Sequence, residues 1–395
     1  MRWCCLTDHF LKKRRGERER AAFYENGSLL VEKLIASCNA KPIPIRTFSP
    51  QQLLQATNNY SSELLECYWG YWYKGSLEGR IVLIKRLYGY RADLLINDLA
   101  ISAQMSGHSN VLKPIGCCLH TPSPIFVFEF AANGVLADQI YVSRVTERQH
   151  QPMVWERRLK IARQIAHALS YLHTAFPRPV IQMYIDLYSI LLDENDVPKL
   201  SDFYFSVPIP EGEADVEVYH GLGKSIRSST PELKVTRKAT EKTDVYNFGR
   251  SLLELLTGDD SRNITRFTID EDSSLVAYIH NRAQGSCIYE IVDPAILAED
   301  GEGGASLEHQ LQAVVDLALT CTEEYPQRRP TMVDVTKQLR RIERFTQTGE
   351  VVLGNLQNLK RHESFEVHAS ASLKRNASSD EIQAVNEAPE RPLEV

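Results

Sequence analysis

Residues 171–205 read YLHTAFPRPVIQMYIDLYSILLDENDVPKLSDFYF, and this stretch decides how the rest of the chain is interpreted. Upstream of it, WERRLKIARQIAHALSYLH (155–173) carries apolar residues at the spacing of a helix. Downstream, DVYNFGRSLLELLTG (244–258) is a second helical pattern, and it ends at Gly258, a residue typical of helix C-termini. The quoted stretch therefore begins at the end of one predicted helix and precedes another, in an α-rich part of the chain.

The region before it has a different pattern. Between about residues 70 and 130, RIVLIKRL (80–87) and SPIFVFEF (123–130) are short runs of β-branched and aromatic residues, which predict strands. ADLLINDLAISAQM (92–105), between these two runs, predicts a helix, and LEHQLQAVVDLALTCT (307–322) predicts another one further on. A small β-rich part is therefore expected to precede a larger α-rich part.

The two ends of the chain differ from this central region. Residues 1–21 are polar and basic, and ENGSLLVEKLIASC (25–38) predicts a short helix that Ser28 can cap. Ser49 and Pro50 are a typical N-cap and first helical residue, so the N-terminal helical extension is expected to span residues 22–54. Residues 346–395 are polar and rich in Ser, Ala and Glu, which favours disorder.

Composition excludes several classes of protein. Of 395 residues, 43% are hydrophobic, which is enough for a folded core, and the net charge of −6 argues against a nucleic-acid-binding surface. The eight cysteines contain no Cys-x-x-Cys pair, which argues against a zinc site or disulfide scaffold and favours a reducing compartment. No apolar run reaches the roughly 18 residues of a membrane-spanning helix, and the N-terminus lacks the apolar core of a secretory signal.

The order of these motifs resembles a eukaryotic protein kinase domain over about residues 55–345, in the style of plant receptor-like and wall-associated kinases. The matching stretches are GCCLHTPSPIFVFEF, WERRLKIARQIAHALSYLH, DVYNFGRSLLELLTG and RRPTM. The resemblance implies an α+β fold with a small β-rich N-lobe and a larger α-helical C-lobe. It also implies binding of ATP and Mg²⁺, provided that the residues for this chemistry are present.

The nucleotide-binding positions of the N-lobe are partly kept. Of the three loop glycines, which fall at Leu65, Cys67 and Gly70, only Gly70 is present. Lys85 matches the strand lysine that contacts phosphates, and Asp98 replaces its usual glutamate partner, one methylene shorter. The resemblance adds Glu129 to this set. The expected result is weak or absent nucleotide binding.

The catalytic loop departs most from the family pattern, H-R-D-x-K-x-x-N. Gln182, Met183 and Tyr184 replace its first three residues, so a neutral phenol lies where the catalytic aspartate belongs. Asp186 reverses the charge of the loop lysine, and Ser189 replaces the metal-holding asparagine. An alternative is that Asp186 serves as a relocated base after a shift of two residues.

The positions after the catalytic loop match the family pattern only in part. Asp202 keeps the metal-binding aspartate of D-F-G, whereas Tyr204 replaces its glycine and should restrict switching of this segment. Asp202 is expected either to hold one Mg²⁺ or to make only local hydrogen bonds. Asp244, Glu232 and Arg329 match positions that keep the C-lobe folded. A scaffold kept without its chemistry is typical of a pseudokinase.

The N-terminal block makes the resemblance more specific. ENGSLLVEKLIASC followed by PIPIRTFSPQQLLQATNNYS resembles the plant ZED-related kinases, which are receptor-like cytoplasmic pseudokinases. The resemblance implies an adaptor that binds a coiled-coil NLR immune receptor through its leucine-rich repeats. It would then detect a pathogen effector, directly or through another receptor-like cytoplasmic kinase. The rival hypotheses are an active wall-associated-type Ser/Thr kinase and an ATP-binding scaffold without catalysis.

Two segments are candidates for partner contacts. The first is the predicted helix of residues 25–38, which either docks on its own domain or binds a partner through Leu29, Leu30, Leu34 and Ile35. The second follows Asp202 and is either an ordinary solvated loop or a recognition loop open to modification. Its candidate residues are Glu211, Glu213, Ser225, Ser228, Ser229 and Thr230. The expected location is the cytoplasm, and Cys4 and Cys5 beside basic residues leave open a peripheral attachment to the plasma membrane.

Overall fold

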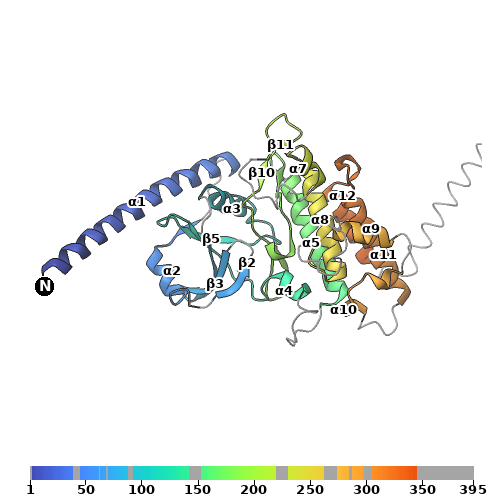
Figure 1. The fold of residues 1–395 in the computed structure, drawn as a ribbon, viewed down its shortest axis with the longest axis horizontal. Helices are drawn as coiled ribbons and strands as arrows, with labels where there is room; N and C mark the ends of the chain where they lie inside the picture. Colours follow the sequence, from blue (N-terminus) through green and yellow to red (C-terminus); the bar gives the residue numbers. More distant parts are fainter. Residues whose placement is uncertain are drawn as a thin grey trace, which may run out of the picture. The chain divides into compact units, whose positions relative to one another are not determined.

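The computed structural model describes most of the chain up to residue 344. The described ranges are 2–38, 45–61, 63–67, 70–87, 92–141, 153–218, 230–261, 274–283, 287–297 and 304–344. The predicted C-terminal tail, residues 346–395, lies outside the described residues. The model contains the predicted division into a β-rich N-lobe and an α-rich C-lobe (Figure 1).

The N-lobe contains a six-stranded sheet with strands in the order β1-β5-β6-β4-β3-β2. Its strands are β1 (Arg46–Thr47), β2 (Glu63–Cys67), β3 (Gly70–Leu77), β4 (Arg80–Arg86), β5 (Pro114–Cys118) and β6 (Ile125–Glu129). The predicted strands at 80–87 and 123–130 are thus confirmed as β4 and β6. The antiparallel register places Trp72 of β3 and Phe126 of β6 directly beside Lys85 of β4. This register surrounds the lysine with large apolar neighbours.

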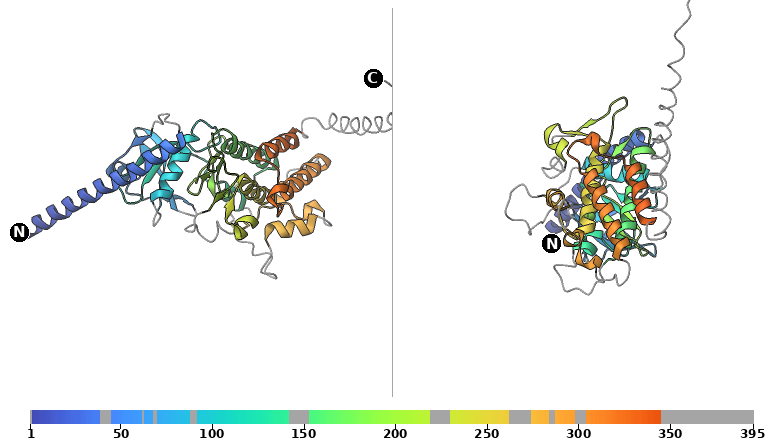
Figure 2. Two further views of the ribbon diagram at one scale, coloured as in Figure 1. Left: turned by 90° about the horizontal axis from the view of Figure 1, so that it is seen from above. Right: turned by 90° about the vertical axis from the view of Figure 1, so that its right-hand side faces the viewer.

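Three helices accompany the sheet: α1 (Arg2–Cys38), α2 (Pro50–Ala56) and α3 (Ala92–Gln104). Ser49 caps α2 as predicted. Its side chain accepts the Gln52 backbone N–H, and the Gln52 side-chain oxygen accepts the Ser49 backbone N–H. The second half of α1 lies beside α3 (Figure 1, Figure 2). Asn26 attaches α1 to the sheet region, since its amide donates to the carbonyls of Leu119 and Thr121, both at 3.0 Å.

The predicted start of the first helix at Ser28 is wrong. The helix begins at Arg2 and runs without a break through residue 28 and through the expected boundary between residues 21 and 22. Charged residues with good helix propensity fill its first part, and Arg15 and Glu19, one turn apart, form an ion pair at 2.9 Å. A serine therefore caps no helix here, because the residues before it are already helical.

The C-lobe is built around α8, whose residues are buried along most of its length. Its helices are α4 (Leu136–Tyr141), α5 (Trp155–Thr174), α7 (Pro231–Val235), α8 (Glu241–Thr257), α9 (Leu275–Ala283), α10 (Pro294–Leu297), α11 (Gly304–Cys321) and α12 (Met332–Arg344). The predicted helices at 155–173, 244–258 and 307–322 correspond to α5, α8 and α11. Gly258 ends α8 in the left-handed conformation, with φ of 69°, as predicted. None of the described helices is both long and apolar enough to cross a membrane.

Short elements connect these helices and carry the site. They are β7 (Val180–Ile181), β8 (Ile190–Leu192), β9 (Pro198–Leu200), β10 (Val207–Pro208), β11 (Val216–Glu217), β12 (Lys238–Ala239), and the 3₁₀ turns η2 (Leu187–Ser189), η4 (Ile288–Glu290) and η5 (Pro326–Arg328). β7 pairs with β10, and β8 pairs with β9. These pairings fix the loops around Tyr184 and Asp202 against each other.

A buried ion pair joins α7 to the segment before α12. Arg329 donates to both carboxylate oxygens of Glu232, at 2.9 and 2.8 Å, and its side chain is fully buried. Burial acts to raise the pKa of Glu232, but the hydrogen bonds and positive charge of Arg329 outweigh it, so the pKa lies below the usual value of 4.5. The pair therefore links two segments that are far apart in the sequence.

We expect Arg329→Ala to lower the free energy of unfolding by about 3–5 kcal/mol, because it leaves a buried carboxylate without its partner. The adjacent Arg328→Ala is a matched control, since the Arg328 side chain is 69% exposed and should change stability little. Urea unfolding followed by fluorescence measures both. Equal effects of the two substitutions would contradict the structural role of the pair.

The same pair predicts a pH dependence. Because the folded pKa of Glu232 is below its unfolded value, the pair stabilises the protein above pH of about 4.5. This contribution is lost as the pH falls through the folded pKa. Arg329→Ala should therefore flatten the loss of stability in this acidic range relative to wild type.

Candidate functional site

The centre of the interlobe site is the ammonium group of Lys85. Its Nζ lies 2.9 Å from Asp98 on α3 and also forms an ion pair with Asp202. Although the Asp98 side chain is one methylene shorter than glutamate, it reaches the lysine. Asp98 also accepts the Phe203 backbone N–H at 2.7 Å. Burial raises the pKa of Asp98, although the Lys85 ammonium acts to lower it. The structure thus brings Lys85, Asp98 and Asp202 together.

Aromatic rings cover the same ammonium. The Lys85 Nζ lies 4.2 Å from the ring centre of Tyr204, 4.8 Å from that of Trp72 and 5.8 Å from that of Phe128. The Lys85 side chain is fully buried. Cation–π contacts and ion pairs together stabilise the buried ammonium. We refer to Lys85, Trp72, Phe128 and Tyr204 as the lysine cage.

Sequence reasoning missed Trp72 and Phe128. The available signal was the register of the strands, because Trp72 lies two residues after Gly70 on a strand that must pair with the strand of Lys85. Tyr204 was noted as a replacement for a flexible glycine. The left-handed backbone occurs instead at Asp202, with φ of 65°. The tyrosine contributes its ring to the cage.

One side chain holds the segment after Asp202 against α3. The amide of Asn97 donates to the carbonyls of Phe203, Tyr204 and Ser206, at 3.1, 3.3 and 2.9 Å. Asn97 is 9% exposed, so these bonds form largely away from water. This contact fixes the position of the Tyr204 ring over Lys85.

The catalytic-loop positions lie together below the cage. Asp244, at the start of α8, accepts the backbone N–H groups of Gln182 and Met183, at 2.8 and 2.9 Å, and contacts His173 at 2.8 Å. The Gln182 side chain in turn accepts the Tyr184 N–H and donates to the Asp202 carbonyl. These bonds hold the loop in one conformation.

Asp186 and Ser189 are bonded to each other. The Asp186 carboxylate accepts the Ser189 N–H at 2.9 Å and caps η2, while the Ser189 hydroxyl donates to the Asp186 carbonyl at 2.7 Å. A cavity of about 10 Å³ remains beside them, lined by Tyr184, Asp186, Tyr188, Ser189, Asp202, Tyr204 and Phe205. This volume is enough for roughly one water molecule.

The described residues fit Mg²⁺-ATP poorly. Asp202, the retained metal-binding aspartate, is already paired with Lys85, and the Ser189 hydroxyl is engaged with Asp186. Gly70 begins β3, and the Glu129 carboxylate accepts the Lys113 N–H.

The predicted contact residues of α1 separate into two sets. Leu30 is 8% exposed, and Leu29 and Leu34 also pack against the core. These three leucines therefore dock the helix on its own domain, which was the first of the two alternatives predicted for it. Ile35, in contrast, is 68% exposed.

The predicted residues after Asp202 also differ among themselves. Glu211 and Glu213 are exposed. The prediction that Thr230 is open to modification is wrong. Thr230 is 1% exposed, and its hydroxyl caps α7 by accepting the Leu233 N–H. The threonine precedes a proline at the first helical position, a typical N-cap sequence. Ser225, Ser228 and Ser229 lie outside the described residues.

We expect Asn97→Leu to destabilise the protein by about 1–3 kcal/mol, because three buried carbonyl groups lose their donor. Hydrogen exchange of residues 203–206 should accelerate at the same time. Asn195→Leu is the matched control, because Asn195 is exposed. Unchanged exchange in residues 203–206 would show that Asn97 does not hold this segment.

Comparison with known proteins identifies the family. The model of the protein tyrosine and serine/threonine kinase family matches residues 61–339. Three proteins of Arabidopsis thaliana are similar over most of their length. Serine/threonine-protein kinase ZRK1 is 37% identical, covering 83% of this chain and 95% of that protein. Non-functional pseudokinase ZRK2 is 38% identical, covering 84% and 92%, and Non-functional pseudokinase ZED1 is 38% identical, covering 84% and 98%. With its kinase fold and this similarity, the chain belongs to the ZED-related kinase family, a group of plant kinases and pseudokinases.

Proposed function

We propose that this protein is a pseudokinase that acts as an adaptor for a coiled-coil NLR immune receptor in the recognition of pathogen effectors. The observation that carries the loss of catalysis is the lysine cage. The ion pair between Lys85 and Asp202 would have to break, and the Tyr204 ring would have to move, before the Lys85 ammonium could reach a phosphate. Both changes oppose nucleotide binding.

The catalytic loop supports the same proposal. Tyr184 presents a neutral phenol where a kinase places a carboxylate base, and losing a general base costs about 10²–10⁴ in rate. The guanidinium of Arg250 lies 6.0 Å from the centre of the Tyr184 ring and donates to the Ile185 carbonyl. The Arg250 guanidinium stays protonated, so it cannot accept a proton in place of the carboxylate.

A second candidate function is phosphotransfer with Asp186 as a relocated base. The observation that favours it is the position of Asp186, which lines the same small cavity as Asp202. Several of the similar proteins, ZRK1 among them, are also named serine/threonine-protein kinases. Against it, the Asp186 carboxylate already caps η2. An activity assay separates this candidate from the pseudokinase.

We expect Mg²⁺-ATP neither to raise the melting temperature of the purified protein nor to support incorporation of labelled phosphate. Asp202→Asn is the control for the assay. The double variant Trp72→Val/Tyr204→Gly opens the cage, and nucleotide should then raise its melting temperature by about 2–4 °C at ten times Kd.

Two results would contradict this view. A clear melting shift of the wild-type protein would mean that the cage does not exclude nucleotide. Label incorporation that Asp202→Asn abolishes would favour the active kinase instead.

The adaptor part of the proposal rests on the family resemblance and on an exposed face of α1. Tyr24, Val31 and Ile35 are 73%, 56% and 68% exposed. Their spacing of seven and four residues puts them on one side of the helix, and all three are more exposed than the leucines that dock on the domain. An apolar stripe of this kind suits contact with another protein.

We expect Tyr24→Ser/Ile35→Ser to weaken copurification with leucine-rich-repeat domains of plant coiled-coil NLR receptors at least tenfold, with the fold unchanged. Val235→Ser/Ile81→Ser is the matched control, since these side chains are 84% and 50% exposed on other elements. Capture that survives the α1 double substitution, or that both double variants lose equally, would count against this surface.

A further inference from the structure

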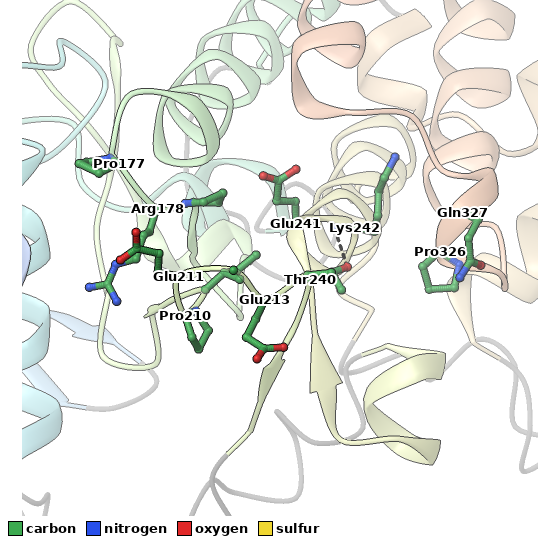
Figure 3. A pocket seen from close by; sticks show the side chains of 14 residues that line it. Pro177, Arg178, Pro210, Glu211, Glu213, Thr240, Glu241, Lys242, Pro326 and Gln327 are labelled. Carbon is green, nitrogen blue, oxygen red and sulfur yellow. Dashed lines mark hydrogen bonds between the residues drawn. The ribbon is translucent and has the colours of Figure 1, made fainter.

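A cavity of about 510 Å³ lies on the C-lobe, away from the lysine cage. Four segments line it: residues 177–179 after α5, residues 209–214 after β10, residues 240–242 at the start of α8, and residues 326–327 of η5. Figure 3 shows Glu241 and Glu213 on either side, Arg178 and Glu211 at one end, and Pro326 with Gln327 at the other. The volume falls in the range of ligand-binding pockets.

The cavity has an excess of negative charge. Glu211, Glu213 and Glu241 line it, and no hydrogen bond or ion pair within the described ranges holds their carboxylates. Lys242 also lines it, but its ammonium donates to the carbonyls of Arg329 and Pro330. Arg178 is therefore the single cation of the lining whose charge is not engaged elsewhere in the described residues. A cationic group is the complementary ligand.

Four prolines and an isoleucine add apolar surface to the lining, beside the polar Thr240 and Gln327. Pro177, Pro179, Pro210 and Pro326 contribute their rings, and Ile209 is buried at 6% exposure. Proline rings offer apolar surface on a backbone with fixed φ. The methylene groups of a long basic side chain can pack on such a surface while the charged end reaches a carboxylate.

A second cavity of about 340 Å³ adjoins the first and shares Pro177, Arg178 and Glu211 with it. Its other lining residues come from α1 and α3, including Lys33, Ala36 and Ile101, and from Phe176, Val180 and Pro208 of the C-lobe. Because the two cavities share three residues they adjoin each other, and we refer to them together as the groove. A groove of this extent suits an extended peptide better than a small molecule.

We propose that this groove binds an extended segment of a partner protein and that the larger cavity receives an arginine side chain of that segment. The arginine fork can pair with the carboxylates of Glu213 and Glu241 while its stem lies on the proline rings. Tyr24, Val31 and Ile35 do not line the groove, so substitutions in the stripe test the receptor contact and substitutions of Glu213 and Glu241 test the groove.

The probe is an acetylated nonapeptide of three Ala-Leu-Arg repeats, compared with the same peptide carrying citrulline for arginine. Binding is followed through the δ1-methyl signal of Ile209 in methyl NMR of the full chain. We expect the arginine peptide to shift this signal and the citrulline peptide to shift it at least fivefold more weakly. Raising the salt concentration should weaken the arginine complex, because the attraction is electrostatic.

The substitutions Glu213→Gln/Glu241→Gln keep the shape of the cavity and remove its charge, and should weaken the arginine peptide about tenfold. Glu194→Gln/Glu290→Gln, at exposed sites outside the groove, is the matched control and should leave binding unchanged. The proposal is overturned if the Ile209 signal does not respond to the arginine peptide. It is equally overturned if citrulline replaces arginine without loss, or if the control and the groove substitutions act alike.

Discussion

The arrangement of the interlobe site depends on the buried charge of Lys85. A lone ammonium in a protein interior is costly, and here Asp98 and Asp202 compensate it. Tyr204 and Trp72 then close the remaining approach with their ring faces. In a catalytic kinase, a nucleotide phosphate shares this position with the lysine. Here side chains of the protein itself compensate the charge.

Residues that satisfy buried polar groups differ from positions with a predicted catalytic role in what the fold requires of them. Asp244 and the Glu232–Arg329 pair satisfy buried donors and charges, so removing any of them would leave an unpaired group in the interior. Tyr184 and Ser189 are the positions at which the sequence predicts a lost catalytic role. Asp244 holds their loop through the Gln182 and Met183 N–H groups, so the loop conformation does not depend on these two side chains alone.

The sequence predicted the elements whose signals are local. Apolar periodicity located α5, α8 and α11, and caps at Ser49 and Gly258 marked helix ends, because these patterns depend on neighbours within a few residues. The start of α1 was predicted wrongly at Ser28, since a cap residue is also tolerated inside a helix. Family resemblance located the Lys85, Asp98 and Asp202 positions, but it could not say what covers them.

The sequence by itself determined the kinase fold and the order of its elements. Tertiary structure alone decided that Trp72, Phe128 and Tyr204 meet over one ammonium, because strand register and the Asn97 contact bring together residues up to 132 positions apart. It also decided which side of α1 docks and which stays exposed. Contacts between distant segments depend on how whole elements pack, and no local pattern of residues records that packing.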